Sequence, residues 1–381
     1  MKIGIPKEIY ENETRVAVIP EMISSLTREK HEVFVESGAG LGASFSDSEY
    51  VDAGATIIAN PVDLYKTVDI ILKVQPPQKH PKAKKHEVDL LKEGTTLIGY
   101  LSPLTNTNAV NKLAQRKITS FSMEYIPRIT RAQSMDSLSS MATIAGYKAV
   151  LMAADHLGKI FPLLMTAAGT IPPATALILG AGVAGLQAIA TAKRLGARVE
   201  AFDPRPAVKE QVESLGATFI EMEVPEDAET EGGYAKELPE DFLKREQDAI
   251  GKRMPKIDVV ITTAQIFGKK APILITEDMV KMMRPGSVIV DLAAEQGGNC
   301  ELTKAGESVE KYDVTIIGAV NLPAQVPVHA SQMYSKNIIN LVRHLFQAED
   351  GALDFEDEIT KGACITHNGE IVNEMVKNAI K

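Results

Sequence analysis

The sequence predicts an α/β protein with two parallel-sheet domains that are linked by long helices and have a cleft between them. Three observations lead to this prediction. Short apolar runs alternate with polar helical stretches along the 381 residues. A glycine-rich turn joins one apolar run directly to a helical stretch. The composition, 45% hydrophobic and 24% charged, is that of a globular protein, and the length suffices for two domains.

The first domain is expected to be a parallel α/β unit. A polar stretch at 20–30 has the pattern of a helix, and short apolar runs on either side of it have the pattern of strands. Further strand candidates, separated by helices, complete the unit; the runs lie at residues 33–35, 56–58, 68–74, 95–100 and 118–123. A proline-free helical stretch over 134–157 then leads into the second domain.

The second domain is expected to be a doubly wound sheet. After the glycine-rich turn, apolar runs predict strands that are each preceded by a helical stretch, at residues 217–220, 258–262, 287–291 and 314–318. A further helical stretch at 331–346 and a short tail are expected to return to the first domain. We therefore place a discontinuous first domain at 1–137 plus 325–381, and the second domain at 138–324.

The glycine-rich turn, Gly180-Ala-Gly182-Val-Ala-Gly185, has the spacing of the fingerprint of a Rossmann-like, dinucleotide-binding domain. The first glycine permits a tight turn, the second lets the backbone approach a pyrophosphate, and the third allows close packing of helix on sheet. The helix that follows aims its N-terminus at the phosphates. The apolar run before the turn and the helix after it make the setting appropriate.

A second apolar run, at 198–202, ends in Asp203, which lies about where the fingerprint places its ribose-binding acid. A carboxylate there accepts hydrogen bonds from the ribose diol and repels a 2′-phosphate, so NAD(H) is favoured over NADP(H). Arg205 leaves this preference open. It could receive a 2′-phosphate, cover the adenine or pair with Asp203.

Charge and cysteine content argue against several other classes of protein. The net charge is −9, and the lysines and arginines are spread out, which disfavours nucleic-acid binding. Cys300 and Cys364 are too far apart in sequence to suggest a metal site or a disulfide framework. No signal peptide is apparent, so a cytoplasmic location is expected. The uncharged stretch 160–192 is interrupted by prolines and glycines, which argues against a membrane span.

The segment 224–241 is acidic, contains two adjacent glycines and has no apolar periodicity. It is either a mobile lid, hinged at Gly232 and Gly233 with Tyr234 at its tip, or a solvated insert without a task. A second unusual segment spans 127–140. If a helix begins near Gln133, then Gln133, Asp136 and Ser139 share one face and could hold a carboxamide. Asp and Ser are equally ordinary capping residues at a helix start.

Four segments resemble the NAD(H)-binding component of the proton-translocating nicotinamide nucleotide transhydrogenases. They are PRITRAQSMDSLSS at 127–140, MTAAGTIPPA at 165–174, GAGVAGLQAIATAKRLGA at 180–197 and GGYAKE at 232–237. The resemblance covers essentially the whole chain. Shorter motifs at 5–8, 13–17 and 71–74 resemble alanine dehydrogenase, a more distant member of the same superfamily.

Alanine dehydrogenase is the rival interpretation. The resemblance implies that Arg15 and Lys73 would hold its substrate, and both are present. However, Ser102 stands where a histidine acid/base should follow the strand, and Glu295 replaces the aspartate of the Asp-x-Ala-x-Asp-Gln-Gly-Gly pattern. Serine cannot shuttle protons near neutral pH as imidazole does. Hydride transfer between two nicotinamides needs no acid or base, so the transhydrogenase interpretation is preferred and Arg15 and Lys73 become structural remnants.

The transhydrogenase resemblance also implies individual roles. Arg128, Asp136 and Ser139 would orient the NAD(H) carboxamide, and Gln133 would reach the NADP(H) of a partner subunit. Further NAD(H) contacts would come from the same segment, the fingerprint, the second strand, the mobile loop and the end of the strand at 258–262; these are Ile129, Thr130, Arg131, Gly180, Gly182, Val183, Gly185, Asp203, Pro204, Arg205, Gly233, Tyr234, Gln247, Ala264 and Gln265. No metal is expected.

The resemblance further implies a homodimer that works with two partners. One is a membrane subunit that translocates protons, and the other is an NADP(H)-binding subunit. The chain would act as a separate subunit, peripheral on the cytoplasmic face of the inner membrane. A third possibility is a non-enzymatic module that senses NAD(H). The sequence does not indicate relative affinities for NAD⁺ and NADH or the direction of flux.

Overall fold

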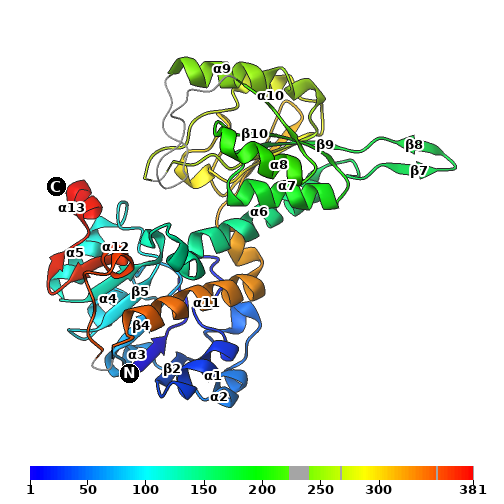
Figure 1. Cartoon of the computed structure of the whole chain (residues 1–381). Helices are drawn as coiled ribbons and strands as arrows, with labels where there is room; N and C mark the ends of the chain where they lie inside the picture. The colour runs from blue at the N-terminus through cyan, green and yellow to red at the C-terminus, as the bar shows by residue number, and fades with distance from the viewer. Residues whose placement is uncertain (223–239, 267, 349–350, 381) are drawn as a thin grey trace. The chain divides into compact units, whose positions relative to one another are not determined.

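The computed structural model describes residues 1–222, 240–266, 268–348 and 351–380, which form two compact units (Figure 1). Unit 1 comprises Met1–Met141 and Pro323–Lys381, and unit 2 comprises Ala142–Leu322. Each unit has a largely parallel sheet with helices. The predicted fold class is therefore confirmed.

Unit 1 contains an eight-stranded sheet in the order β17-β16-β6-β5-β4-β1-β2-β3. The six N-terminal strands are parallel, and the two strands from the C-terminal segment add to one edge in antiparallel pairing. The strands are β1 (Lys2–Ile5), β2 (Glu32–Glu36), β3 (Thr56–Ile58), β4 (Ile70–Leu72), β5 (Thr96–Gly99), β6 (Thr119–Ser122), β16 (Cys364–His367) and β17 (Glu370–Ile371).

The helices of unit 1 are α1 (Pro20–Arg28), α2 (Asp47–Asp52), α3 (Pro61–Thr67), α4 (Glu87–Leu90), α5 (Thr107–Gln115), α11 (Pro327–Leu345), α12 (Glu358–Ala363) and α13 (Glu374–Ile380). Helix α11 ties the C-terminal segment to the N-terminal one. Its Ser331 and Ser335 hydroxyls accept hydrogen bonds, both of 3.0 Å, from the backbone N–H groups of Val16 and Ile19. These bonds hold the loop that carries Arg15.

Unit 2 has a seven-stranded sheet in the order β11-β10-β9-β12-β13-β15-β14. The chain crosses over after β11, so the strand order reverses between β9 and β12, the point at which such sheets bind ligands. The strands are β9 (Thr175–Leu179), β10 (Arg198–Phe202), β11 (Thr218–Phe219), β12 (Val259–Thr262), β13 (Val288–Asp291), β14 (Ser308–Lys311) and β15 (Val314–Gly318). The helices are α6 (Ser137–His156), which begins in unit 1, α7 (Val183–Arg194), α8 (Lys209–Ser214), α9 (Glu240–Gly251) and α10 (Glu277–Lys281).

Both faces of the unit 2 sheet are covered, which explains why its central strands are continuously apolar. On β9, Ala176 and Ile178 pack with α6, α7 and α8, whereas Leu177 and Leu179 pack on the opposite face with α9 and α10 (Figure 1). Successive residues of a strand point to opposite faces, so each face receives every second side chain. The sheet is thereby fixed between two layers of helices.

Two features of unit 2 differ from expectation. The strand at 314–318 is preceded by the antiparallel strand β14, not by a helix, because Tyr312 and Asp313 adopt left-handed conformations and form a tight hairpin turn. In addition, β7 (Leu164–Thr166) and β8 (Gly169–Ile171) form a hairpin whose strand residues are all exposed. The hairpin projects away from the sheet of its own unit (Figure 1).

Candidate functional site

The fingerprint glycines of unit 2 meet three different steric demands. Gly180 has φ +94°, and a Cβ on it would clash with the Thr263 hydroxyl. A Cβ on Gly185 would collide with the Gly180 carbonyl oxygen, so helix α7 approaches the turn as closely as only glycine allows. A Cβ on Gly182 would meet only Arg205 Nη2, at 3.9 Å. The backbone at Gly182 is thus open to close approach by a ligand, as the fingerprint predicts.

Helix α7 begins directly after this opening, at Val183. Its N-cap, Gly182, has no side chain to satisfy the first N–H groups, and the first turn contains no acidic residue. The free N–H groups and the helix dipole together favour a negatively charged group. This end of α7 therefore has the properties needed to bind a pyrophosphate.

Asp203 follows β10 and is tied to the fingerprint loop. It is buried, and its Oδ2 accepts a hydrogen bond of 2.7 Å from the backbone N–H of Ala181. Arg205 forms a two-pronged ion pair with it, with Nε to Oδ1 and Nη2 to Oδ2 distances of 2.8 Å. Of the three possibilities left open for Arg205, pairing with Asp203 is the one in the structure.

Glu246 on α9 is a buried acid that the sequence reasoning missed. Its residue is 6% exposed, and burial, reinforced by the nearby Asp203 charge, raises the pKa of its carboxyl to about 8. The missed signal is a polar residue on the apolar stripe of a helix, four residues from both Phe242 and Ile250. The predicted contact, Gln247, instead donates from Nε2 to the Ile273 carbonyl oxygen at 2.7 Å.

The loop that follows β12 carries Ala264 and Gln265. It lies at the carboxyl end of that strand, next to β9 in the sheet. The Thr263 hydroxyl donates to the carbonyl oxygens of Leu179 and Gly180, at 3.3 and 3.1 Å. This loop and the fingerprint are therefore one hydrogen-bonded structure within unit 2.

In unit 1, the predicted helical face of Gln133, Asp136 and Ser139 is wrong. Residues Thr130–Met135 form a 3-10 helix, and α6 begins only at Ser137. The Asp136 carboxylate explains the break, because it accepts hydrogen bonds from the Ser139 N–H at 2.9 Å and the Ser139 hydroxyl at 2.5 Å. This is N-capping, the simpler of the two interpretations.

The other predicted residues of this segment lie around the 3-10 helix. Arg128, Thr130 and Gln133 are exposed, and Ile129 is partly buried. Arg131 forms an ion pair of 2.5 Å with Asp357, whose carboxylate also caps α12. The segment is thus attached to the C-terminal part of the chain.

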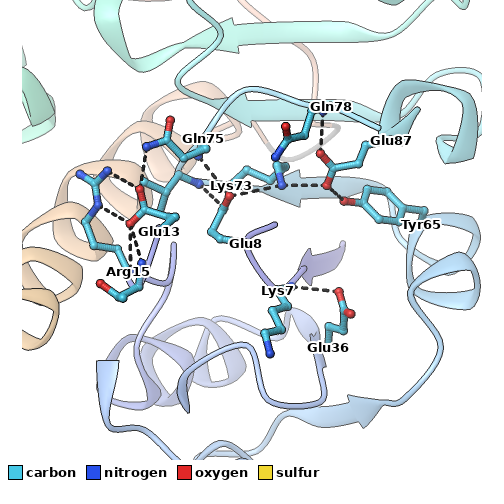
Figure 2. A network of polar contacts seen from close by, with 12 residues as sticks. Lys7, Glu8, Glu13, Arg15, Glu36, Tyr65, Lys73, Gln75, Gln78 and Glu87 are labelled. Atoms are coloured by element: carbon cyan, nitrogen blue, oxygen red, sulfur yellow. Dashed lines mark hydrogen bonds and ion pairs between the residues drawn. The ribbon is translucent and has the colours of Figure 1, made fainter. Parts of the chain in front are cut away.

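Arg15 and Lys73, the residues that would hold the substrate of an alanine dehydrogenase, are each engaged by buried acids (Figure 2). Arg15 donates to both oxygens of Glu13, at 2.8 and 2.6 Å. Lys73 lies 2.8 Å from a Glu87 oxygen and 3.4 Å from a Glu8 oxygen. The two cations therefore take part in the internal structure of unit 1.

Ser102, which replaces the expected histidine, lies in a strained turn. It has φ +47°, and its backbone N–H donates to the Glu124 carboxylate at 2.8 Å. Burial raises the pKa of Glu124, although Ser122 and the N–H groups of Leu101 and Ser102 counteract this effect. A hydroxyl at position 102 cannot replace the acid/base function of imidazole.

Several expectations concern absences or lie outside the described residues. Within the described parts of the chain, no group of His, Cys, Asp and Glu is arranged to hold a metal ion. Among the helices described, none is long and apolar enough to cross a membrane. Cys300 and Cys364 are buried free thiols. The predicted lid with Gly233 and Tyr234 lies outside the described residues, which omit 223–239.

Comparisons with known proteins agree with this geometry. Residues 4–145 match the N-terminal domain, and 149–374 the C-terminal domain, of alanine dehydrogenase/PNT. The chain is 50% identical over 377 residues to an NAD(P) transhydrogenase subunit alpha protein of Rhodospirillum rubrum, covering 98% of each chain. A transhydrogenase structure from Sinorhizobium meliloti is 42% identical, with a TM-score of 0.87 over 98% of this chain and all of that one. An L-alanine dehydrogenase structure is 28% identical, with a TM-score of 0.83 over 100% of this chain and 99% of that one.

Proposed function

Because the chain belongs to the alanine dehydrogenase/PNT family, we propose that it is the NAD(H)-binding component of a proton-translocating transhydrogenase. It exchanges hydride directly between its own NAD(H) and the NADP(H) of a partner subunit, and a membrane subunit couples this exchange to proton translocation. The observation that carries the proposal is the fingerprint turn joined to a buried acid, Asp203, at the end of β10.

The reaction requires no proton transfer in the site. A hydride leaves the dihydronicotinamide ring of NADH and joins the nicotinamide ring of NADP⁺, so one nucleotide is oxidised and the other is reduced. Catalysis is then positional: the rings are held in register and water is excluded. The geometry of Ser102 supports this choice over a dehydrogenase that needs an acid/base.

Arg128, Asp136 and Ser139 are proposed to orient the carboxamide of NAD(H), which selects the ring face that reacts. The cap between Asp136 and Ser139 supports this role, because it holds the Ser139 hydroxyl in one place. Gln133 is exposed, as a residue that reaches a second nucleotide must be. The remaining proposed NAD(H) contacts are Ile129, Thr130, Arg131, Gly180, Gly182, Val183, Gly185, Asp203, Pro204, Arg205, Gly233, Tyr234, Gln247, Ala264 and Gln265.

The proposal includes a homodimer that binds peripherally to the cytoplasmic face of the membrane through its partner subunits. The β7–β8 hairpin supports self-association. Leu164 is 42%, Met165 75% and Ile171 47% exposed, although large apolar side chains are normally covered. A two-stranded hairpin is marginal by itself and gains stability by packing against another surface.

The decisive experiment combines the purified chain with the NADP(H)-binding component of a transhydrogenase. NADH and an NADP⁺ analogue are added, and reduction of the analogue is followed by absorbance. Transfer that depends on both proteins supports the proposal. NADH binding without transfer would instead identify an NAD(H)-sensing module, whereas formation of pyruvate from alanine and NAD⁺ would identify an alanine dehydrogenase.

A further inference from the structure

The loop after β13 is organised by one buried carboxylate. Asp291 is the last residue of the strand and is fully buried. Its two oxygens accept five hydrogen bonds of 2.6–3.1 Å, from Thr262 Oγ1, the N–H groups of Ala293, Asn299 and Cys300, and Thr303 Oγ1. The chain from 292 to 303 is therefore wrapped around the Asp291 side chain.

Asn299, which this loop places in the interior, uses its side chain to hold a neighbouring loop. It is fully buried, and its Oδ1 accepts from the Ala264 N–H at 3.1 Å. Its Nδ2 donates to the carbonyl oxygens of Ala264 at 2.9 Å and Pro272 at 2.8 Å. Both polar groups of Ala264 thus pair with one amide, which also determines how that amide is oriented.

A second tie joins the same two loops. Gln265 donates from Nε2 to the Leu292 carbonyl oxygen at 2.8 Å. On the other side of Ala264, the Thr263 hydroxyl bonds to the Gly180 carbonyl oxygen. The bonds consequently run from Asp291 through Asn299, Ala264 and Thr263 to the first glycine of the fingerprint.

We propose that Asn299 is a positioning residue for NAD(H): it sets the height of the Ala264 backbone, and through Thr263 that of the Gly180 turn, against the bound nucleotide. This inference rests on the proposed function. Because the Ala264 N–H is engaged by Asn299, Ala264 faces the nucleotide as an apolar surface. Asn299 acts through this backbone segment and does not itself contact the nucleotide.

The test measures nucleotide affinity and stability separately. Asn299→Ala should weaken NADH binding by about tenfold, because it leaves three buried backbone groups without their partner. Binding is followed by NADH fluorescence at a temperature at which circular dichroism shows the variant to be folded. Ser287→Ala is the matched control. It removes a buried hydroxyl that donates to the Ile257 carbonyl oxygen at 3.4 Å, at the opposite end of the same sheet, and should leave NADH affinity unchanged.

Asn299→Asp provides a second variant with a distinctive pH response. It retains the acceptor for the Ala264 N–H but places a carboxylate oxygen against two carbonyl oxygens. Protonation supplies a donor again, so the affinity of this variant relative to the unmodified chain should recover as the pH falls. If both variants bind NADH as tightly as the unmodified chain, the positioning role is overturned. If the unmodified chain itself does not bind NADH, the proposed function fails instead.

Discussion

Asp203 serves two structural partners before any nucleotide binds. Its carboxylate holds the Ala181 N–H and forms a two-pronged pair with Arg205, so it fixes the fingerprint turn and neutralises the arginine together. To receive a 2′-phosphate, Arg205 would have to leave this pair. The ion pair therefore strengthens the preference for NADH, because the cation next to Asp203 is already engaged.

Asp203→Asn should weaken NADH binding by about 1–3 kcal/mol, because charge-assisted hydrogen bonds to the ribose are lost. It should also narrow the preference for NADH over NADPH, since Arg205 is released from its ion pair. Fluorescence titration with both nucleotides measures the two effects. An unchanged NADH to NADPH affinity ratio would show that Arg205 does not face the 2′-position.

Glu13 makes the stability of unit 1 dependent on pH. Burial alone would raise its pKa, but the hydrogen bonds and charge of Arg15 lower it to about 2 from an ordinary value of 4.5. A carboxyl with a depressed folded-state pKa contributes stability that is complete above its unfolded-state pKa. This contribution is lost as the pH falls from about 4.5 towards the folded-state value.

Glu13→Gln should accordingly destabilise the protein by roughly 3–5 kcal/mol at neutral pH, because the buried Arg15 loses its counter-charge. The difference from the unmodified chain should shrink as the pH falls below about 4.5. Urea denaturation at a series of pH values provides the measurement. A difference that stays constant or grows on acidification would mean that the ion pair is not the source of the stability.

At the scale of elements, the packing of α6 on α7 depends on one glycine. Gly146 of α6 lies so close to α7 that a Cβ on it would collide with the Ala184 carbonyl oxygen. Since a backbone group cannot yield as a flexible side chain can, Gly146→Ala should destabilise the protein by about 1–3 kcal/mol. The change in melting temperature is the readout. Gly158→Ala, which meets nothing within 4 Å, is the control and should cause little change.

The strands of both sheets could be predicted because their apolar runs reflect burial on both faces, as at β12 and β13. Strand β14 could not, because only one of its residues, Val309, is apolar and none is fully buried. The start of α6 was also beyond a periodicity argument. It depends on whether the Asp136 side chain caps the helix or lies within it, and both choices suit the same residues. The pairing of Arg205 with Asp203 was undecided for a similar reason, since three partners suit one guanidinium.

At the scale of the whole molecule, the proposed reaction is shared between proteins. Everything that unit 2 is proposed to supply serves one nucleotide, whereas a hydride acceptor must come from a partner. The residue proposed to meet that partner's nucleotide is Gln133, which is exposed and lies outside α6, on the 3-10 helix that precedes it. Since it does not belong to the Asp136 cap, it can be altered without disturbing that cap.

Gln133→Asn should therefore leave NADH affinity nearly unchanged and slow hydride transfer to the NADP⁺ analogue. Shortening the side chain by one methylene moves its amide by roughly 1 Å, and a misplacement of this size can cost on the order of 100-fold in rate. Arg128→Ala is the contrasting variant and should impair both NADH binding and transfer, because Arg128 is proposed to touch the bound nicotinamide. Single-turnover kinetics with the partner, together with NADH titration, separates the two outcomes. A Gln133→Asn variant that bound NADH weakly but transferred hydride at the normal rate would place Gln133 in the NADH pocket and refute the positional role.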